Sequence, residues 1–358
     1  TGSGCSDIIS EVAEVIVIED PIITTQALTS QTLCQGTVPQ NLAIVVSGGI
    51  GTIYNYQWFS NTINSNTGGT LISGATNSVF TPPTTAVGTV YYYSEITQAA
   101  AGCSVASDTA EVNINPAPIF TSQPVSQTIC LGEIFNTLSV GYSNGVGTPS
   151  YQWYSNTTND SATGSPITSE TSSTFTPPSG IVGTTFYYAI ITFSSGGCTE
   201  IISNVSEQTL NQTPNISDKT RTICSGVTFD IIPDNSGGDT TPSGTFYTWT
   251  NPTITPAGAI SGASNETIGQ TSISQTLINN TTNPANVAYT VTPISGICTG
   301  TDFIITITVN PSISIVDTIT NSSCYISNTG SIEISITGGV PFTTGNPYQI
   351  SWTGPNGY

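Results

Sequence analysis

A period of about 95 residues runs through this chain of 358 residues and limits what it can fold into more than any other feature. Trp58, Trp153 and Trp249 follow one another at steps of 95 and 96 residues. Two motifs keep the same step: Tyr-Gln-Trp at 56–58 and 151–153, and Phe-Thr-Pro-Pro at 80–83 and 175–178. Similarity at a fixed period is typical of a string of modules that share one fold.

The eight cysteines fall into two interleaved series with nearly the same period. Members of one series stand two residues before a glycine in the first three modules, and the series comprises Cys34, Cys130, Cys224 and Cys324. Members of the other series stand one or two residues after a glycine, and the series comprises Cys5, Cys103, Cys198 and Cys298. Each module therefore carries one cysteine of each kind.

Prolines mark the borders between modules, because proline ends a strand and stops another from continuing through it. We predict three whole modules, at 21–116, 117–213 and 214–310. Residues 1–20 read as the C-terminal end of a preceding module, and 311–358 as the N-terminal part of a following one.

Strand and turn signals fill each module. Segments such as Glu111–Asn115 and Ile305–Val309 alternate polar and apolar residues, as half-buried strands do, and glycine and asparagine clusters separate them. No segment has a convincing helical period. About seven short strands in about 95 residues indicate an immunoglobulin-like sandwich. The predicted fold class is all-β, with tandem immunoglobulin-like β-sandwich modules that form an extended rod.

The charge composition excludes several classes of function. The chain has 2 basic and 21 acidic residues, a net charge of −19 and no histidine. Nucleic-acid binding needs clustered lysine and arginine, and histidine-dependent catalysis and metal binding need histidine. No apolar run is long enough to cross a membrane, so we expect no membrane insertion. We predict no catalytic residues and no enzymatic activity, because carboxylates are spread thinly and the one lysine, Lys219, lies at a module border.

The order of motifs resembles a known group of proteins. Cys-x-Gly, Tyr-Gln-Trp, Thr-Pro-Pro, Tyr-Tyr and Gly-Cys follow one another as in Ig-like and PKD-like modules of very large surface proteins of the Bacteroidota, above all the SprB-like gliding-motility adhesins. The third module lacks Thr-Pro-Pro and the Tyr-Gln before Trp249, and looks more PKD-like. The segments Gly330–Pro341 and Tyr348–Trp352 look like the start of an SprB-type repeat.

This resemblance implies a location and a function. Such adhesins are cargo of the type IX secretion system, so it implies an extracellular, outer-membrane-associated protein at the cell surface. Its partners would be the secretion and gliding machinery, reached through other parts of the full-length chain. The chain would be a non-catalytic segment of an adhesin filament for attachment and gliding motility. Two alternatives stay open: a glycan-binding module for surface polysaccharides, or an accessory stalk of a secreted polysaccharide-degrading enzyme.

The secreted setting that the resemblance implies makes the cysteines candidates for disulfides. Pairing within modules would join 34 to 103, 130 to 198 and 224 to 298. Pairing across borders would join 5 to 34, 103 to 130, 198 to 224 and 298 to 324. We favour the first pattern, because each module then closes its own core; its members are Cys34, Cys103, Cys130, Cys198, Cys224 and Cys298.

Aromatic residues are candidates for the core or for sugar contacts. A lone tryptophan on the third strand of an Ig-like sandwich is usually buried. We therefore assign four tryptophans to module cores: Trp58, Trp153, Trp249 and Trp352. In Tyr91–Tyr93 and Tyr187–Tyr188 the side chains alternate between faces, so one side is predicted as core and the other as exposed, where it would contact glycans or the surrounding surface.

Hydroxyl and acidic residues offer two further kinds of site. Four Asp-Thr or Asp-Ser pairs followed by Ala, Thr or Ile resemble the short O-glycosylation motif of this phylum, with acceptors Thr109, Ser161, Thr240 and Thr318. Calcium could bind at Glu19–Asp20, or at Asp234 and Asn235 with Asp239, but neither group has the spacing of a defined calcium loop. We predict a solvated acidic surface there, and no cofactor.

Overall fold

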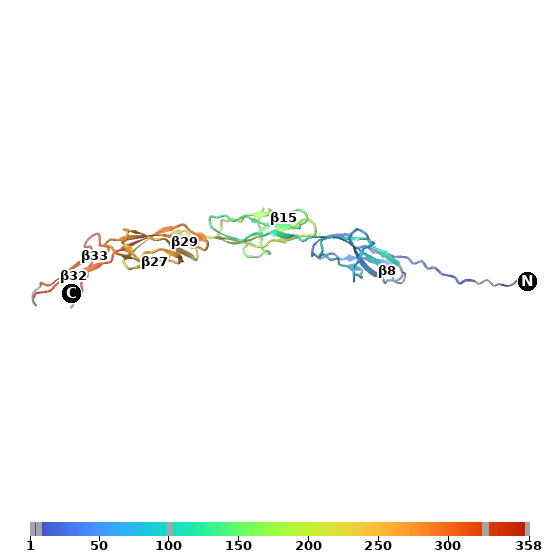
Figure 1. Ribbon diagram of the computed structural model, residues 1–358, viewed down its shortest axis with the longest axis horizontal. Helices are drawn as coiled ribbons and strands as arrows, with labels where there is room; N and C mark the ends of the chain where they lie inside the picture. Colours follow the sequence, from blue (N-terminus) through green and yellow to red (C-terminus); the bar gives the residue numbers. More distant parts are fainter. Residues whose placement is uncertain (1–3, 5–8, 99–102, 324–328, 355–358) are drawn as a thin grey trace. The chain divides into compact units, whose positions relative to one another are not determined.

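The computed structural model describes residues 4, 9–98, 103–323 and 329–354, and all regular elements in these ranges are β-strands (Figure 1). This confirms the all-β class. None of the described residues forms a helix long and apolar enough to cross a membrane. The chain divides into two compact units, which we describe separately. The first comprises Thr1–Ser126, Thr137–Thr176 and Thr185–Glu207, and the second Gln127–Asn136, Pro177–Thr184 and Gln208–Tyr358.

The first repeat (21–116) lies wholly in the first unit. Its strands are β1 (Pro21–Thr25), β2 (Ser30–Cys34), β3 (Leu42–Ala43), β4 (Val45–Gly48), β5 (Asn55–Asn61), β6 (Thr70–Leu71), β7 (Val79–Phe80), β8 (Gly88–Gln98), β9 (Cys103–Ala106) and β10 (Ala110–Asn115). The larger sheet has the order β2-β10-β8-β5-β6, and β9 also pairs with β8. The pairs β1–β4 and β3–β7 form two small sheets.

Alternation along the strands builds the core of this repeat. In β10 the side chains of Ala110, Val112 and Ile114 are buried, and the residues between them are half-buried. They pack in one cluster with Leu42 of β3 and Trp58 of β5. Successive residues of a strand face opposite sides, so the period of two in the sequence selects which face closes the sandwich.

Trp58 is the centre of that cluster and is 0% exposed. Its ring stacks on Phe80, with centroids 5.4 Å apart, and its indole Nε1 donates to the Asn77 carbonyl at 2.9 Å. The Gln57 amide nitrogen donates to the carbonyl oxygens of Trp58 and Ile72. The Tyr-Gln-Trp and Phe-Thr-Pro-Pro motifs therefore recur because one aromatic cluster and its polar contacts recur.

The second repeat (117–213) shares its strands between the two units. Its strands are β11 (Ile119–Ser122), β12 (Gln127–Cys130), β13 (Leu138–Ser139), β14 (Gly141–Ser143), β15 (Pro149–Asn156), β16 (Ser165–Pro166), β17 (Thr174–Phe175), β18 (Gly183–Phe193), β19 (Glu200–Ile202) and β20 (Ser206–Asn211). In the first unit β15 pairs with β16 and with residues 186–193 of β18, and β19 also pairs with β18. Trp153 is 0% exposed, lies 5.6 Å from Phe175 and donates to the Ser172 carbonyl at 2.9 Å.

The third repeat (214–310) lies in the second unit. Its strands are β21 (Lys219–Cys224), β22 (Thr228–Ile231), β23 (Thr245–Trp249), β24 (Thr253–Thr255), β25 (Ile260–Ser261), β26 (Glu266–Gln270), β27 (Ile273–Thr276), β28 (Ile278–Asn279), β29 (Ala285–Ser295), β30 (Cys298–Thr299) and β31 (Phe303–Asn310). The main sheet has the order β21-β31-β29-β23-β26, with β24 and β30 also on β29. Trp249 is buried against Tyr289, edge to face at 6.5 Å, so this repeat builds its core with another aromatic pair.

The segment after the third repeat forms one antiparallel hairpin, β32 (Ser314–Thr320) and β33 (Ser331–Thr337). Most of its apolar side chains are exposed, and Trp352 is 56% exposed. The prediction that Trp352 belongs to a core is wrong for the described chain. The physical reason is that the described part of this segment has only the two-stranded hairpin, and no second sheet is present to cover the hairpin or Trp352, which follows it.

We predict that Trp153→Ala lowers the free energy of unfolding of the second repeat by about 3–5 kcal/mol, because it leaves a large cavity in a closed core. Trp352→Ala is the matched control and should change stability by less than about 0.5 kcal/mol, as an exposed site does. Calorimetric unfolding of both variants measures the difference. Equal losses would contradict the core assignment.

Candidate functional site

One strand pairing decides where the cysteine of the first series lies. β2 runs parallel to β10, the last strand of the same repeat, and Cys34 stands opposite Asn115 in the register. Cys130 stands opposite Asn211 in the same way. A cysteine from the start of each repeat is thereby carried to the C-terminal end of that repeat.

The cysteine of the second series lies at the opposite end. In the first repeat Cys103 pairs with Gln98, the last residue of β8, whereas the other end of β8, Gly88, pairs with Ile114 beside Cys34. Ten residues of extended strand span about 33 Å. A disulfide requires Cα atoms no more than about 7 Å apart, so these two cysteines of one repeat cannot bond.

The observed disulfides join consecutive repeats instead. Cys34 bonds to Cys198 within the first unit, and Cys130 bonds to Cys298 within the second. The predicted pairs 34–103, 130–198 and 224–298 are therefore wrong. The alternative pairs 5–34, 103–130, 198–224 and 298–324 are also wrong, because each contains one of the four bonded cysteines. Cys5 and Cys324 themselves lie outside the described residues.

Two cysteines stand outside these bonds. The Cys103 thiol is half-buried at the start of β9, and its hydrogen bond with the Asp20 carboxylate raises its pKa. Cys224 is exposed at the end of β21, opposite Asn310, and has no disulfide partner among the described residues. It holds the position in its repeat that Cys34 and Cys130 hold in theirs.

A glycine turn fits the first disulfide against the preceding repeat. Cys34 and Cys198 are both buried. The Asn115 side-chain amide donates to the Gly196 carbonyl at 2.9 Å. Gly197 has φ of +77°, and a Cβ at this position would lie 2.5 Å from the Leu33 Cα atom. The turn therefore needs glycine both for its backbone conformation and for its close approach to β2.

The second disulfide is enclosed by different residues. Cys298 is buried and Cys130 is half-buried. The Leu131 amide donates to the Asn211 carbonyl at 2.8 Å, which continues the parallel pairing past Cys130. Ile297 stands before this cysteine, where Gly197 stands before Cys198, and its side chain is exposed. The connectivity is shared by the two junctions, but the turn that delivers the second cysteine is not.

Each disulfide closes a long loop, with sequence separations of 164 and 168. In the chain-entropy model a loop of this length restricts the unfolded chain enough to contribute about 5 kcal/mol of stability. That contribution is shared between two repeats, because the loop contains most of both. The disulfides are thus the feature of the described chain that makes neighbouring repeats depend on each other covalently.

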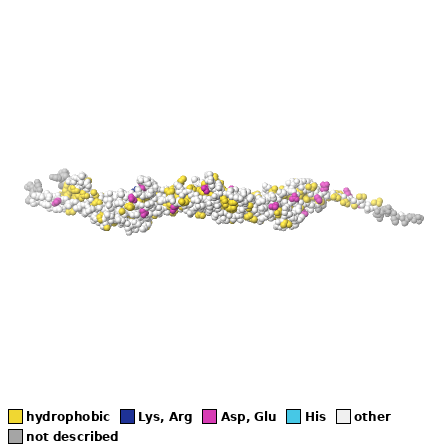
Figure 2. Space-filling view, turned by 90° about the horizontal axis from the view of Figure 1, so that it is seen from above, with side chains coloured by type: hydrophobic (Ala, Val, Ile, Leu, Met, Phe, Trp, Pro, Cys, Tyr) yellow, Lys and Arg dark blue, Asp and Glu magenta, His cyan; other side chains and the backbone are white. Residues whose placement is uncertain are grey.

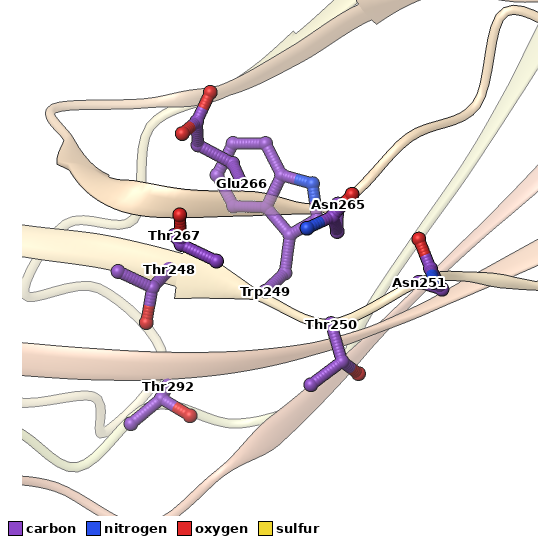
Figure 3. Close-up of a pocket in the computed structure, with 8 residues that line it drawn as sticks. All are labelled: Thr248, Trp249, Thr250, Asn251, Asn265, Glu266, Thr267 and Thr292. Carbon is purple, nitrogen blue, oxygen red and sulfur yellow. The ribbon is translucent and has the colours of Figure 1, made fainter.

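Shallow grooves recur beside the strand that carries the tryptophan of each repeat, which is β5, β15 or β23. In the first two repeats the grooves have volumes of about 310 and 360 Å³. Equivalent residues line both of them: Ser60, Asn61 and Thr62 in the first repeat, and Ser155, Asn156 and Thr157 in the second. The third groove, of about 410 Å³, is lined by Thr248, Trp249, Thr250, Asn251, Asn265, Glu266, Thr267 and Thr292 (Figure 3). Hydroxyl and amide groups dominate all three.

The tyrosines predicted as exposed are largely covered. Tyr92 faces the core, which agrees with one buried side, but Tyr93 on the other face is also buried. It stacks on Phe59 at 5.1 Å, and its hydroxyl accepts from the Gly69 amide at 3.0 Å. In the second repeat Tyr188 is likewise buried and stacks on Tyr154. The loop that follows β5, and likewise the loop that follows β15, lies over this outer face. Period-two alternation does not reveal this cover.

The candidate calcium residues are engaged in protein contacts. Asp239 is buried, contrary to the predicted solvated surface; it forms an ion pair with Lys219 and accepts from the Ser217 amide at 2.8 Å. Asp234 accepts from the Ser236 amide. The described residues contain no group of three or more acidic or cysteine side chains that could hold a metal ion. The acidic side chains on the visible face lie scattered (Figure 2).

The predicted O-glycosylation acceptors differ in accessibility. Thr318 is exposed on β32, whereas Thr109, Ser161 and Thr240 are half-buried. The Thr109 hydroxyl donates to the Asn64 side chain. Asp160, which precedes Ser161, accepts from the Thr163 hydroxyl, and this hydrogen bond lowers the Asp160 pKa. Modification of the four residues stays a prediction, with Thr318 the most accessible.

The repeats define the chain as a tandem immunoglobulin-like, all-β protein. Residues 23–116 and 121–212 match the family model described as a domain of unknown function, DUF8696, and these segments make up more than half of the chain. The chain therefore belongs to this family. Residues 221–313 match the model of a PKD-like domain, in agreement with the different motifs of the third repeat.

Solved structures of tandem immunoglobulin domains are similar to this chain. The titin I-band fragment I67–I69 has 11% identity and a TM-score of 0.39, with 82% of this chain and 99% of that chain covered. Domains 1–5 of Sidekick-1 have 13% identity and a TM-score of 0.30, covering 82% and 60%. The three N-terminal domains of the bacteriophage RB49 Hoc protein have 12% identity and a TM-score of 0.31, covering 83% and 100%. No curated protein matches the chain.

We predict that Gly197→Ala destabilises the first junction, because the new Cβ meets the Leu33 backbone and the residue has positive φ. The transition temperature should fall by several degrees, and the Cys34–Cys198 bond should form more slowly on refolding. Gly180→Ala is the control, since nothing lies within 4 Å of a Cβ there. Calorimetry and peptide mapping measure both effects. An unchanged Gly197→Ala variant would contradict the close contact.

Stability should depend on pH only in strong acid. The Lys219 ammonium group, which hydrogen-bonds to Asp239, holds the pKa of that carboxyl below its usual value. A depressed folded-state pKa stabilises the fold above the unfolded pKa of about 3.9, and this stability is lost as pH falls further. We therefore expect the transition temperature to stay constant or rise slightly between pH 7 and 5 and to fall below about pH 4.

The variant Asp239→Asn tests the origin of this acid sensitivity. At pH 7 it should lower the free energy of unfolding of the third repeat by about 1–3 kcal/mol, because it removes a charged hydrogen-bond acceptor from Lys219. Below pH 4 its deficit relative to the unmodified chain should shrink. Asp108→Asn, at an exposed position, should change neither quantity. A steep fall between pH 7 and 5 would show that other carboxylates matter more.

Proposed function

We propose that this chain is a non-catalytic spacer segment of a large extracellular adhesin. The observation that carries the proposal is the disulfide between consecutive repeats, formed twice with the same connectivity. A catalytic or regulatory domain has no need of covalent bonds between successive copies of one sandwich. A spacer that must stay intact outside the cell benefits from such bonds, because a repeat that is covalently joined to its neighbour is less able to unfold and be degraded by itself.

The surface chemistry supports an extracellular location. Disulfides persist in oxidising compartments and are rare in the cytosol. The chain has only two basic residues, Lys219 and Arg221, so it offers few sites to trypsin-like proteases. Its net charge of −19 favours solubility and keeps copies apart. These properties suit a chain that functions outside the cell, where chaperones do not assist it.

The finer assignment rests on the sequence resemblance to SprB-like gliding-motility adhesins. On this proposal the chain is part of a cell-surface filament of a member of the Bacteroidota, exported by the type IX secretion system. The gliding machinery would move it through other parts of the full-length protein. The segment itself would hold no cofactor or metal and carry out no reaction, and O-glycans on exposed threonines such as Thr318 would add to its surface.

Glycan binding is a second candidate, favoured by the three polar grooves. Neutral hydroxyl and amide groups at equivalent positions suit weak, repeated contacts with a neutral polysaccharide. The grooves have no exposed aromatic platform: Trp249, the one aromatic residue that lines them, is buried. Several groove side chains are also engaged within the protein, for example Asn61, whose amide donates to the Ser65 carbonyl. We therefore rank this function below the spacer.

Labelling of intact cells tests the primary proposal. An antibody against this chain should label unpermeabilised cells of the source organism, and deletion of the gene should stop movement over surfaces without affecting polysaccharide digestion. The purified chain should be silent on a glycan array. Specific array binding that is lost in Thr62→Arg and Thr157→Arg, which fill two grooves, would favour the glycan-binding function. Loss of digestion in the deletion strain would favour an enzyme stalk.

A further inference from the structure

The two disulfides overlap along the chain. The first closes residues 34–198 and the second closes residues 130–298, so residues 130–198 lie inside both loops. Disulfides confined to single repeats would leave the links between repeats free to extend one after another. The overlap instead makes one covalent network out of most of the three repeats.

We propose that this network limits how far the chain can extend under tension, a property that rests on the proposed spacer function. The shortest covalent path between Cys34 and Cys298 crosses the first disulfide, runs back from Cys198 to Cys130, and crosses the second disulfide. The backbone part of this path advances 68 positions, from 198 to 130, whereas the direct backbone path from 34 to 298 advances 264 positions.

The difference in length is large. An extended chain spans about 3.5 Å per residue, so the backbone from 34 to 298 reaches about 920 Å when no disulfide is present. With both disulfides the limit is about 250 Å. Complete unfolding of all three repeats would lengthen the oxidised chain by far less than it lengthens the reduced one.

The network also determines which residues bear the load. At full extension between the two bonds, only residues 130–198 of the second repeat are taut. The first repeat beyond Cys34 and the third repeat before Cys298 are slack. Loss of one disulfide still leaves a limit, because the shortest path becomes 96 residues without the first bond and 100 residues without the second. Because the loops overlap, either bond alone keeps most of the shortening, 168 or 164 of the 196 positions that the two bonds remove together.

The bonds are placed where reduction is slow. Cys34, Cys198 and Cys298 are buried, and Cys130 is half-buried, so an external thiol meets protein before it meets sulfur. Thiol–disulfide exchange requires access of the attacking thiolate to a sulfur atom. An extension limit that external thiols could quickly remove would be of little use to an exposed chain.

Single-molecule stretching of the full chain by its two termini tests the proposal. Other thiols are first alkylated, and peptide mapping verifies the pairs 34–198 and 130–298. The oxidised chain should reach a final contour length about 670 Å shorter than the chain reduced under denaturing conditions. Cys34→Ser and Cys298→Ser should each give a shortfall of about 580 Å, and the double variant should give none.

These values separate the outcomes. A single variant that fully restores the reduced length would show that the other bond does not form or does not bear load, and would overturn the proposal. So would an oxidised chain that extends like the reduced one. The measurement does not depend on where the protein works, so a cytoplasmic or non-adhesive protein would refute the spacer function while leaving the length limit measurable.

Discussion

The parallel pairing of an early strand with the last strand of the same repeat is the constraint on which the rest of the structure depends. β2 lies along β10, and β12 along β20, each with its cysteine at the C-terminal end of the pairing. A parallel pair needs a long crossover connection, and here the whole sandwich serves as that connection. The pairing therefore joins the two ends of the repeat and presents a cysteine where the next repeat begins.

The core of a repeat and the junction between repeats are therefore stabilised by different interactions. The core of each repeat is held by buried aromatic residues around one tryptophan, with its indole nitrogen bonded to a carbonyl 15 or 19 positions later. At the first junction the contacts between repeats include a covalent bond, a glycine turn and a side-chain hydrogen bond. A chain with 6% charged residues has almost no salt bridges with which to fix neighbours, so disulfides take that role.

The last segment shows what a repeat needs before it can bury its residues. β32 and β33 pair over seven residues and place Ile315, Ile319 and Ile332 on one face, yet these three side chains remain exposed. In the first three repeats further strands form small sheets that pack against the main sheet. Periodicity in the sequence thus selects the face, and the opposite sheet buries it.

The sequence alone determined the repeat length, the strand-rich fold and the three buried tryptophans, because these depend on local alternation and on a period that is visible in one dimension. It also indicated that the third repeat is of another type, through its missing motifs. Only the tertiary structure decided the disulfide partners, the burial of Tyr93 and Tyr188, and the ion pair of Asp239. Sequence separation says nothing about which end of a sandwich a cysteine occupies. That depends on strand direction, which places the two cysteines of the first repeat about 33 Å apart. In the second repeat, Cys130 and Cys198 each bond to a cysteine of a neighbouring repeat.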